Sequence, residues 1–188
     1  MSSVVFNDNL HRITVADFQK MEQVGILKPT ARVELIEGVI VDMSPIGPAH
    51  NGIVDHLSQL LHRAVVDRGI VRTQGSIILN ENNEPEPDIT ILKPKSDFYI
   101  KELPTPEDIF LVIEIADVSL KEDRGLKIPL YAKHNIPEVW LIDIVNKSVE
   151  IYLEPSPSRY QKIVCPEKPG IIKPWLLPNV DVDLSRLF

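Results

Sequence analysis

The chain has 188 residues, of which 44% are apolar, and its formal net charge is −7. This composition suffices to bury a sizeable core, and the length favours one domain over residues 1–188. The acidic balance excludes a protein that holds nucleic acid through a broad basic surface, because such a surface neutralises phosphates with Lys and Arg.

Cys165 is the only cysteine. An internal disulfide and a Cys-based zinc site are therefore excluded, and a reducing cytoplasm is the expected location. The N-terminal stretch MSSVVFNDNLHRITVADF lacks a charged start followed by an apolar core, so no signal peptide is predicted. No apolar run approaches the ~20 residues that a membrane span requires, so no membrane partner is expected.

The first part of the chain predicts a helix, a hairpin and a second helix. Thr14 is a candidate N-cap for a short helix that ends at Gly25. In VELIEGVIVDM, two β-rich arms flank Glu37-Gly38, which predicts a hairpin turn there. From residue 49 to about residue 68 the apolar side chains recur at helical spacing, which indicates an amphipathic helix.

The next part alternates β-rich segments with a helix. The predicted strands cover residues 71–79, 88–92 and 109–116, and the last is almost entirely apolar, as in a central strand. Residues 119–134 predict a helix capped by Ser119, with Glu122 at the capping-box position and an interruption at Pro129.

A hairpin with strands VWLIDI and SVEIYLE follows, and then a strand around residues 160–165. From residue 50 to residue 144 the order is helix, three strands, helix, strand. This order predicts an α/β (α+β) fold with a mixed sheet flanked by helices.

Two acidic residues stand out in this framework. Glu114 lies within the apolar strand IFLVIEIA, where an unpaired carboxylate would be costly to desolvate. Strand alternation puts Glu114 on the same face as Val112 and Ala116, and Asp88 opens a strand that could lie beside it. If the two acids converge, either a shared proton or a divalent cation relieves their repulsion. The structural alternative is a buried ion pair of Glu114 with Arg124 or Lys127.

Asp123, Lys127 and Tyr131 are spaced four residues apart on the following predicted helix and form one polar stripe. This stripe could point towards the acids, where a lysine would offset their charge or support a developing negative charge on a phosphoryl group. Read alone, the stripe is more typical of a solvent-facing surface with a weak Asp-to-Lys pair.

Together these residues resemble the PD-(D/E)XK nuclease superfamily, and more closely the Uma-type family of bacterial restriction endonucleases. The similar segments, which span residues 14–188, are VELIEGVIVDMSP with His50 after it, PEPDITIL, VIEIADVSLKEDRGLKIPLYA, NIPEVWLID and VDVDLSRLF. The resemblance implies a restriction-endonuclease-like core over about residues 49–144, with an extra N-terminal β-hairpin and C-terminal strands.

The chain departs from the superfamily pattern at one position. Ala116 stands two residues after Glu114, where the standard motif has its lysine. The resemblance to the Uma-type family implies that Lys127, on the helix, takes this role. The superfamily often adds an acid from the first core helix. Here Glu34 in the hairpin is the preferred substitute, and Glu37 and His50 are second choices.

The resemblance implies a metal-dependent nuclease that hydrolyses DNA phosphodiester bonds. Mg²⁺ or Mn²⁺ would be held by Asp88, Glu114 and the Ile115 carbonyl, and Lys127 would orient the attacking water or stabilise negative charge. Two alternatives stay open, namely a non-catalytic assembly or regulatory module that keeps the fold, and an enzyme for RNA or a nucleotide. A homodimer or higher homo-oligomer is expected, because two active sites would then face the two strands of a DNA duplex.

Overall fold

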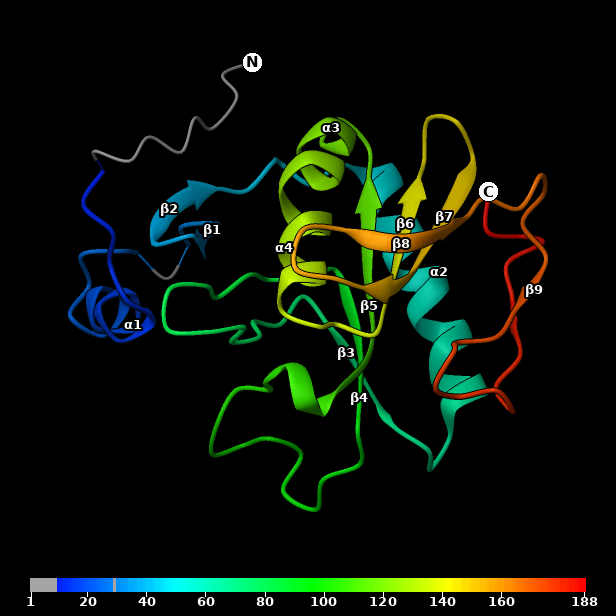
Figure 1. Cartoon of the computed structure of the whole chain (residues 1–188), viewed down its shortest axis with the longest axis horizontal. Helices are drawn as coiled ribbons and strands as arrows, with labels where there is room; N and C mark the ends of the chain where they lie inside the picture. Colours follow the sequence, from blue (N-terminus) through cyan, green and yellow to red (C-terminus); the bar gives the residue numbers. More distant parts are fainter. Residues whose placement is uncertain (1–9, 29) are drawn as a thin grey trace.

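The structure is a computed structural model that describes residues 10–28 and 30–188 (Figure 1). Residues 1–9 lie outside the described residues. They include part of the N-terminal stretch for which no signal peptide is predicted. The centre of the structure is a six-stranded sheet in the order β3-β4-β5-β6-β7-β8. The strands are β3 (Ile70–Thr73), β4 (Ile89–Leu92), β5 (Ile109–Ala116), β6 (Glu138–Asp143), β7 (Ser148–Pro155) and β8 (Tyr160–Val164). Only the β5–β6 pair is parallel among these strands, so the predicted mixed sheet is confirmed.

Helices cover both faces of this sheet, and β5 is buried between them (Figure 1). The helix α2 (Pro48–Val65) packs its apolar stripe on one face, against Leu111, Ile113 and Ile115 of β5. Val112 and Ala116 point to the other face, where they pack in one cluster with residues of α4 (Ile128–Lys133). The alternation expected for Glu114 therefore directs its side chain towards α4.

The predicted helix over residues 119–134 is divided into three parts. It comprises α3 (Leu120–Glu122), the π-helical turn η2 (Asp123–Lys127) and α4. The interruption follows from Pro129, which lacks an N–H and crowds the preceding turn. The predicted capping box is wrong, because Ser119 is itself helical and makes no side-chain cap. Its hydroxyl donates instead to Asp123, 2.6 Å away.

The strand predicted over residues 71–79 is shorter, because β3 ends at Thr73. Gln74 then adopts a positive φ of 47°, which turns the chain out of the sheet. Beyond this turn the backbone forms hydrogen bonds within the same segment. Ile77 N donates to Pro85 O and Leu79 N donates to Asn83 O, each at a distance of 3.0 Å. Since β3 and β4 pair directly and Gln74 N donates to Asp88 O at 2.9 Å, this segment is a long hairpin loop that leads to Asp88.

The N-terminal part consists of α1 (Val15–Gln23) and the hairpin of β1 (Val33–Ile36) and β2 (Val39–Asp42). The predicted turn at Glu37-Gly38 is confirmed, with positive φ at both residues, 49° and 71°. Such a two-residue turn matches the twist of paired strands. Hydrogen bonds from Leu35 N to Glu84 O and from Glu84 N to Leu35 O tie the hairpin to the segment before β4.

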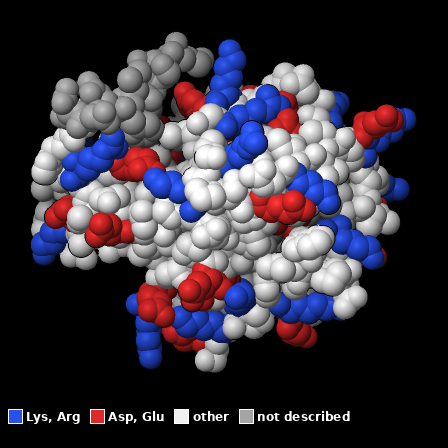
Figure 2. Space-filling view, viewed as in Figure 1, with Lys and Arg blue, Asp and Glu red and all other residues white. Residues whose placement is uncertain are grey.

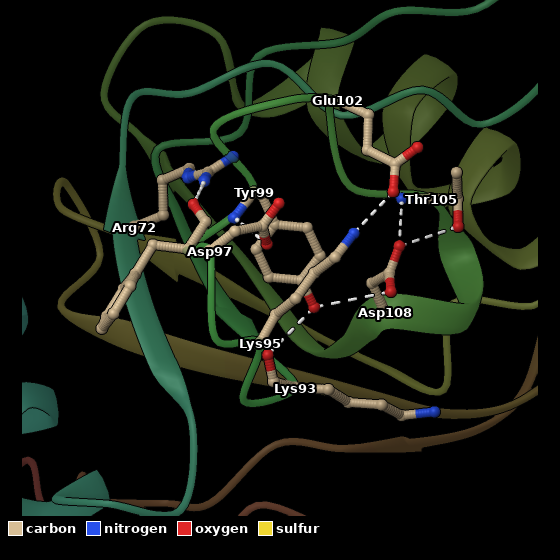
Figure 3. Close-up of polar contacts among 9 residues, drawn as sticks. Arg72, Lys93, Lys95, Asp97, Tyr99, Glu102, Thr105 and Asp108 are labelled. Atoms are coloured by element: carbon tan, nitrogen blue, oxygen red, sulfur yellow. Dashed lines mark hydrogen bonds and ion pairs between the residues drawn. The ribbon is translucent and has the colours of Figure 1, made fainter.

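The connection from β4 to β5, which includes the short helix η1 (Pro106–Asp108), is organised around Tyr99 (Figure 3). The Tyr99 hydroxyl donates to Lys93 O at 2.9 Å, and the cations of Arg72 and Lys95 lie 5.6 and 4.7 Å from its ring centroid. Asp108 and Thr105 form the capping box of η1, in which the Asp108 carboxylate accepts hydrogen bonds from the backbone N–H and the hydroxyl of Thr105. This connection stabilises the β4–β5 pair at one end, and the acids lie at the other.

The C-terminal segment returns to the face that α2 covers. It contains β9 (Ile171–Ile172) and β10 (Val182–Asp183), and its buried residues Val182, Leu184 and Leu187 belong to the same apolar cluster as α2. None of the helices in the described ranges is long and apolar enough to cross a membrane.

Candidate active site

Asp88 lies where β4 separates from β5. The two strands are paired up to Ile89 and Ile113, and β5 continues to Ala116 without β4. Proline at positions 85 and 87 removes the N–H groups that a longer β4 would need. The Asp88 carboxylate replaces the missing strand as the hydrogen-bond partner of β5, because its Oδ2 accepts from Ile115 N at 2.8 Å. This side chain is thus fixed at the point where β4 and β5 separate, called the sheet split below.

Glu114 is the buried acid beside this split. Extending the register from the Ile89–Ile113 pair sets Asp88 opposite Glu114, so both acids belong to one face. Burial raises the pKa of the Glu114 carboxyl to about 8. The Lys127 ammonium opposes this shift, and the Asp88 and Asp123 carboxylates add to it. Burial thus favours the protonated form of Glu114, whereas the neighbouring Lys127 ammonium favours its carboxylate.

The stripe of Asp123, Lys127 and Tyr131 faces the sheet rather than solvent. The Tyr131 hydroxyl donates to Glu114 Oε1 at 2.5 Å, and Lys127 Nζ lies 3.4 Å from the same oxygen. Burial raises the pKa of the Tyr131 hydroxyl well above its usual value, so this hydroxyl acts as a donor. Asp123 is buried too, and burial raises its pKa. Sequence reasoning left Asp123 and Tyr131 out of the site, although their spacing with Lys127 was the available signal.

Glu34 reaches the same group from the N-terminal hairpin. Its Oε2 lies 3.2 Å from Lys127 Nζ and accepts from Glu86 N at 3.2 Å. Burial by itself lowers the pKa of the Lys127 ammonium, but the carboxylates of Glu114 and Glu34 outweigh it, so the net shift is upward. Lys127 is therefore a permanent cation between two acids that come from distant parts of the chain.

The two second-choice residues are placed differently. His50, in the first turn of α2, has its Nε2 3.1 Å from Asp88 Oδ1, and this hydrogen bond raises the His50 pKa despite partial burial. Glu37 instead pairs with Lys133 at 2.9 Å outside the cleft. The structure thus brings together Glu34, His50, Asp88, Glu114 and Lys127, and leaves Glu37 apart.

These residues line a cleft of about 940 Å³ between the hairpin, the end of β5 and the α3–η2 segment. Eight acidic side chains line it, against three cations, Arg32, Lys121 and Lys127. On the face shown in Figure 2, basic and acidic side chains are interspersed rather than gathered into a single basic patch. The acidic side chains outnumber the basic ones, so a polyanion would need a further cation in the cleft, besides these three side chains, to offset the acids.

The donor chemistry of the split fits a hard divalent cation. Mg²⁺ is commonly held by one or two carboxylates, with waters and substrate phosphates completing its shell. Asp88 and Glu114 supply two carboxylates, and Ile115 directs its carbonyl to the same edge as its N–H, towards Asp88. Within the described ranges, no group of three or more His, Cys, Asp or Glu side chains is arranged as a metal cage. The fit is thus to an ion that shares its shell with water and substrate.

Comparisons with known proteins agree with this architecture. A family model for Uma2, described as "Putative restriction endonuclease", matches residues 15–185. The fold is also similar to a crystal structure described as "a putative nuclease belonging to DUF820 from Anabaena variabilis", with a TM-score of 0.74 and 19% identity over 94% of this chain and 97% of the other. A search of curated proteins found no match.

Proposed function

The chain belongs to the Uma2 family of restriction-endonuclease-like proteins, and from this premise we propose that it is a metal-dependent nuclease that hydrolyses DNA phosphodiester bonds. The observation that carries the proposal is the convergence of Asp88, Glu114 and Lys127 at the end of the β4–β5 pair, inside a cleft. Two acids can hold a divalent metal ion that activates water, and a lysine beside them can stabilise negative charge on a phosphoryl group.

Each residue has a role in this proposal. Asp88, Glu114 and the Ile115 carbonyl would hold Mg²⁺ or Mn²⁺, which supplies charge that activates water and neutralises the phosphate. The Lys127 ammonium, fixed by Glu34, would orient the attacking water or stabilise negative charge on the phosphoryl oxygens. Glu34 would therefore act through Lys127, and the cleft would position the scissile phosphate near both.

The test is cleavage of mixed single-stranded and duplex DNA with Mg²⁺ or Mn²⁺, comparing the wild type with Asp88→Asn and Glu114→Gln. We expect metal-dependent cleavage by the wild type and a loss of at least about 100-fold in each variant. Parallel RNA and nucleotide substrates test the substrate class. Absence of cleavage of every substrate, together with absence of Mn²⁺ binding, would overturn the proposal.

A specific observation favours the non-catalytic alternative as the second candidate. Lys127 already neutralises Glu34 and Glu114, so the acids have a counter-ion without any metal. In a structural module, Mn²⁺ would bind no better to the wild type than to Asp88→Asn. Calorimetric titration of both proteins with Mn²⁺ decides between these candidates.

The proposal also includes a homodimer, in which two sites would face two strands. The support is two exposed apolar side chains: Ile163 on the edge strand β8 is 55% exposed, and Trp175, after β9, is 64% exposed. Sedimentation velocity over a range of protein concentrations measures the assembly. A monomer at every concentration would remove this part of the proposal.

A further inference from the structure

Each of the two acids at the sheet split accepts a hydrogen bond from a buried side chain on a helix. Tyr131 of α4 donates its hydroxyl to Glu114 Oε1 at 2.5 Å. His50 of α2 lies against Asp88 with its Nε2 3.1 Å from Oδ1. Tyr131 is fully buried and His50 is 9% exposed. The two helices pack on opposite faces of the sheet, so one donor reaches the acids from each face.

The hydrogen bonds leave oxygen lone pairs for another ligand. On Glu114, both the Tyr131 hydroxyl and the Lys127 ammonium meet Oε1, and no described residue donates to Oε2. On Asp88, Oδ1 meets His50 and Oδ2 accepts from Ile115 N, so each oxygen keeps one lone pair. The carboxylates are thus fixed in orientation without being saturated.

The surroundings of His50 fix which ring nitrogen carries the hydrogen. Its Nδ1 is buried and has no hydrogen-bond partner among the described residues. A hydrogen on Nδ1 would therefore be buried without an acceptor, and the Nε2 lone pair would face the Asp88 carboxylate. A hydrogen on Nε2 avoids both penalties, so His50 is a donor to Asp88.

We propose that Tyr131 and His50 are positioning residues, which hold Glu114 and Asp88 in the orientation that binds a divalent metal ion. This inference rests on the proposed function. Partners that hydrogen-bond to metal ligands restrict ligand orientation, and their removal typically weakens metal affinity by about 10- to 100-fold. The two residues act through the acids and do not touch substrate.

The test is calorimetric titration with Mn²⁺ of Tyr131→Phe, His50→Ala and His50→Gln. Tyr160→Phe is the matched control for Tyr131→Phe, because it removes a buried hydroxyl that donates to Ile136 O, away from the site. His62→Ala is the control on the same helix, since His62 is exposed and, among the described residues, its side chain hydrogen-bonds to Ser58 alone. Far-UV circular dichroism and thermal unfolding establish that each variant is folded.

We expect about 10- to 100-fold weaker Mn²⁺ binding for Tyr131→Phe and His50→Ala, and wild-type binding for both controls. His50→Gln should recover most of the affinity, because its amide can donate to Asp88 and a purely structural role would not give this rescue. Wild-type affinity in either Tyr131→Phe or His50→Ala would overturn the proposal for that residue while leaving the nuclease proposal intact. If the wild type itself binds no Mn²⁺, the positioning proposal falls, and the cleavage assay then decides the nuclease proposal. The two variants probe separate acids, so misfolding of one leaves the other decisive.

Discussion

Lys127 Nζ lies 3.2 Å from Glu34 Oε2, and this contact joins the N-terminal hairpin to the centre of the protein. The same ammonium lies 3.4 Å from Glu114 Oε1. One cation therefore compensates two buried acids that the chain brings together from distant positions. Removing one partner of a buried ion pair typically costs about 3–5 kcal/mol, because the other charge is left uncompensated.

We expect Lys127→Met to abolish cleavage and to lower the free energy of unfolding by about 3 kcal/mol. The matched control is Lys133→Met, whose partner Glu37 forms an ion pair at the surface. That pair should contribute less than about 1 kcal/mol. Urea unfolding and the DNA cleavage assay measure the two effects. Full cleavage by a folded Lys127→Met protein would remove Lys127 from the mechanism.

The pKa of Glu114, raised to about 8 by burial, predicts opposite pH dependences for stability and metal binding. In the metal-free protein the folded state binds this proton more tightly than the unfolded chain. The associated stability is present below the ordinary glutamate pKa and is lost as the pH rises through about 8. Under the proposed function, a metal ion would bind the anion and release the proton, so Mn²⁺ affinity should increase over the same range. Calorimetry in buffers of different ionisation enthalpy counts the released protons, and Glu114→Gln should abolish the effect.

Gly38 should be sensitive to substitution because it holds the hairpin turn at a φ of 71°. A Cβ there would lie 2.7 Å from the Cβ of Arg12. We expect Gly38→Ala to destabilise the protein by at least about 1 kcal/mol and to slow cleavage, since the hairpin carries Glu34. In the control Gly52→Ala, on α2, the added methyl meets nothing within 4 Å and should stabilise the helix by up to about 1 kcal/mol. Equal stabilities for the two variants would contradict this account.

Tyr99 should affect stability without affecting the site, because its loop joins β4 and β5 at the end of the strand pair opposite Asp88 and Glu114. We expect Tyr99→Ala to cost about 3–5 kcal/mol through lost packing and lost cation contacts, with unchanged Mn²⁺ affinity in the folded fraction. Its neighbour Phe98 is 63% exposed, so Phe98→Ala should stay within about 0.5 kcal/mol of the wild type. A single cooperative unfolding transition is expected in each case, as for one domain over residues 1–188.

Local patterns in the sequence predicted several of the main elements of the fold. The apolar periodicity of α2, the turn at Glu37-Gly38 and the apolar strand β5 were all predicted, and the mixed sheet followed from their order. The end of β3 at Thr73 and the absence of a cap at Ser119 were missed. Both depend on backbone conformations that are set by contacts with other segments, and these contacts override local propensity.

The sequence by itself determined that Glu114 needs a partner, because an acid within an apolar strand cannot remain uncompensated. It also indicated Asp88 as the acid that could lie beside it. Tertiary structure decided which other groups surround them. Glu34 and Glu37 are three residues apart in one hairpin, yet only Glu34 reaches Lys127. The physical reason is that strand register and helix packing fix the direction of each side chain, and residues far apart in the chain meet only after these are set.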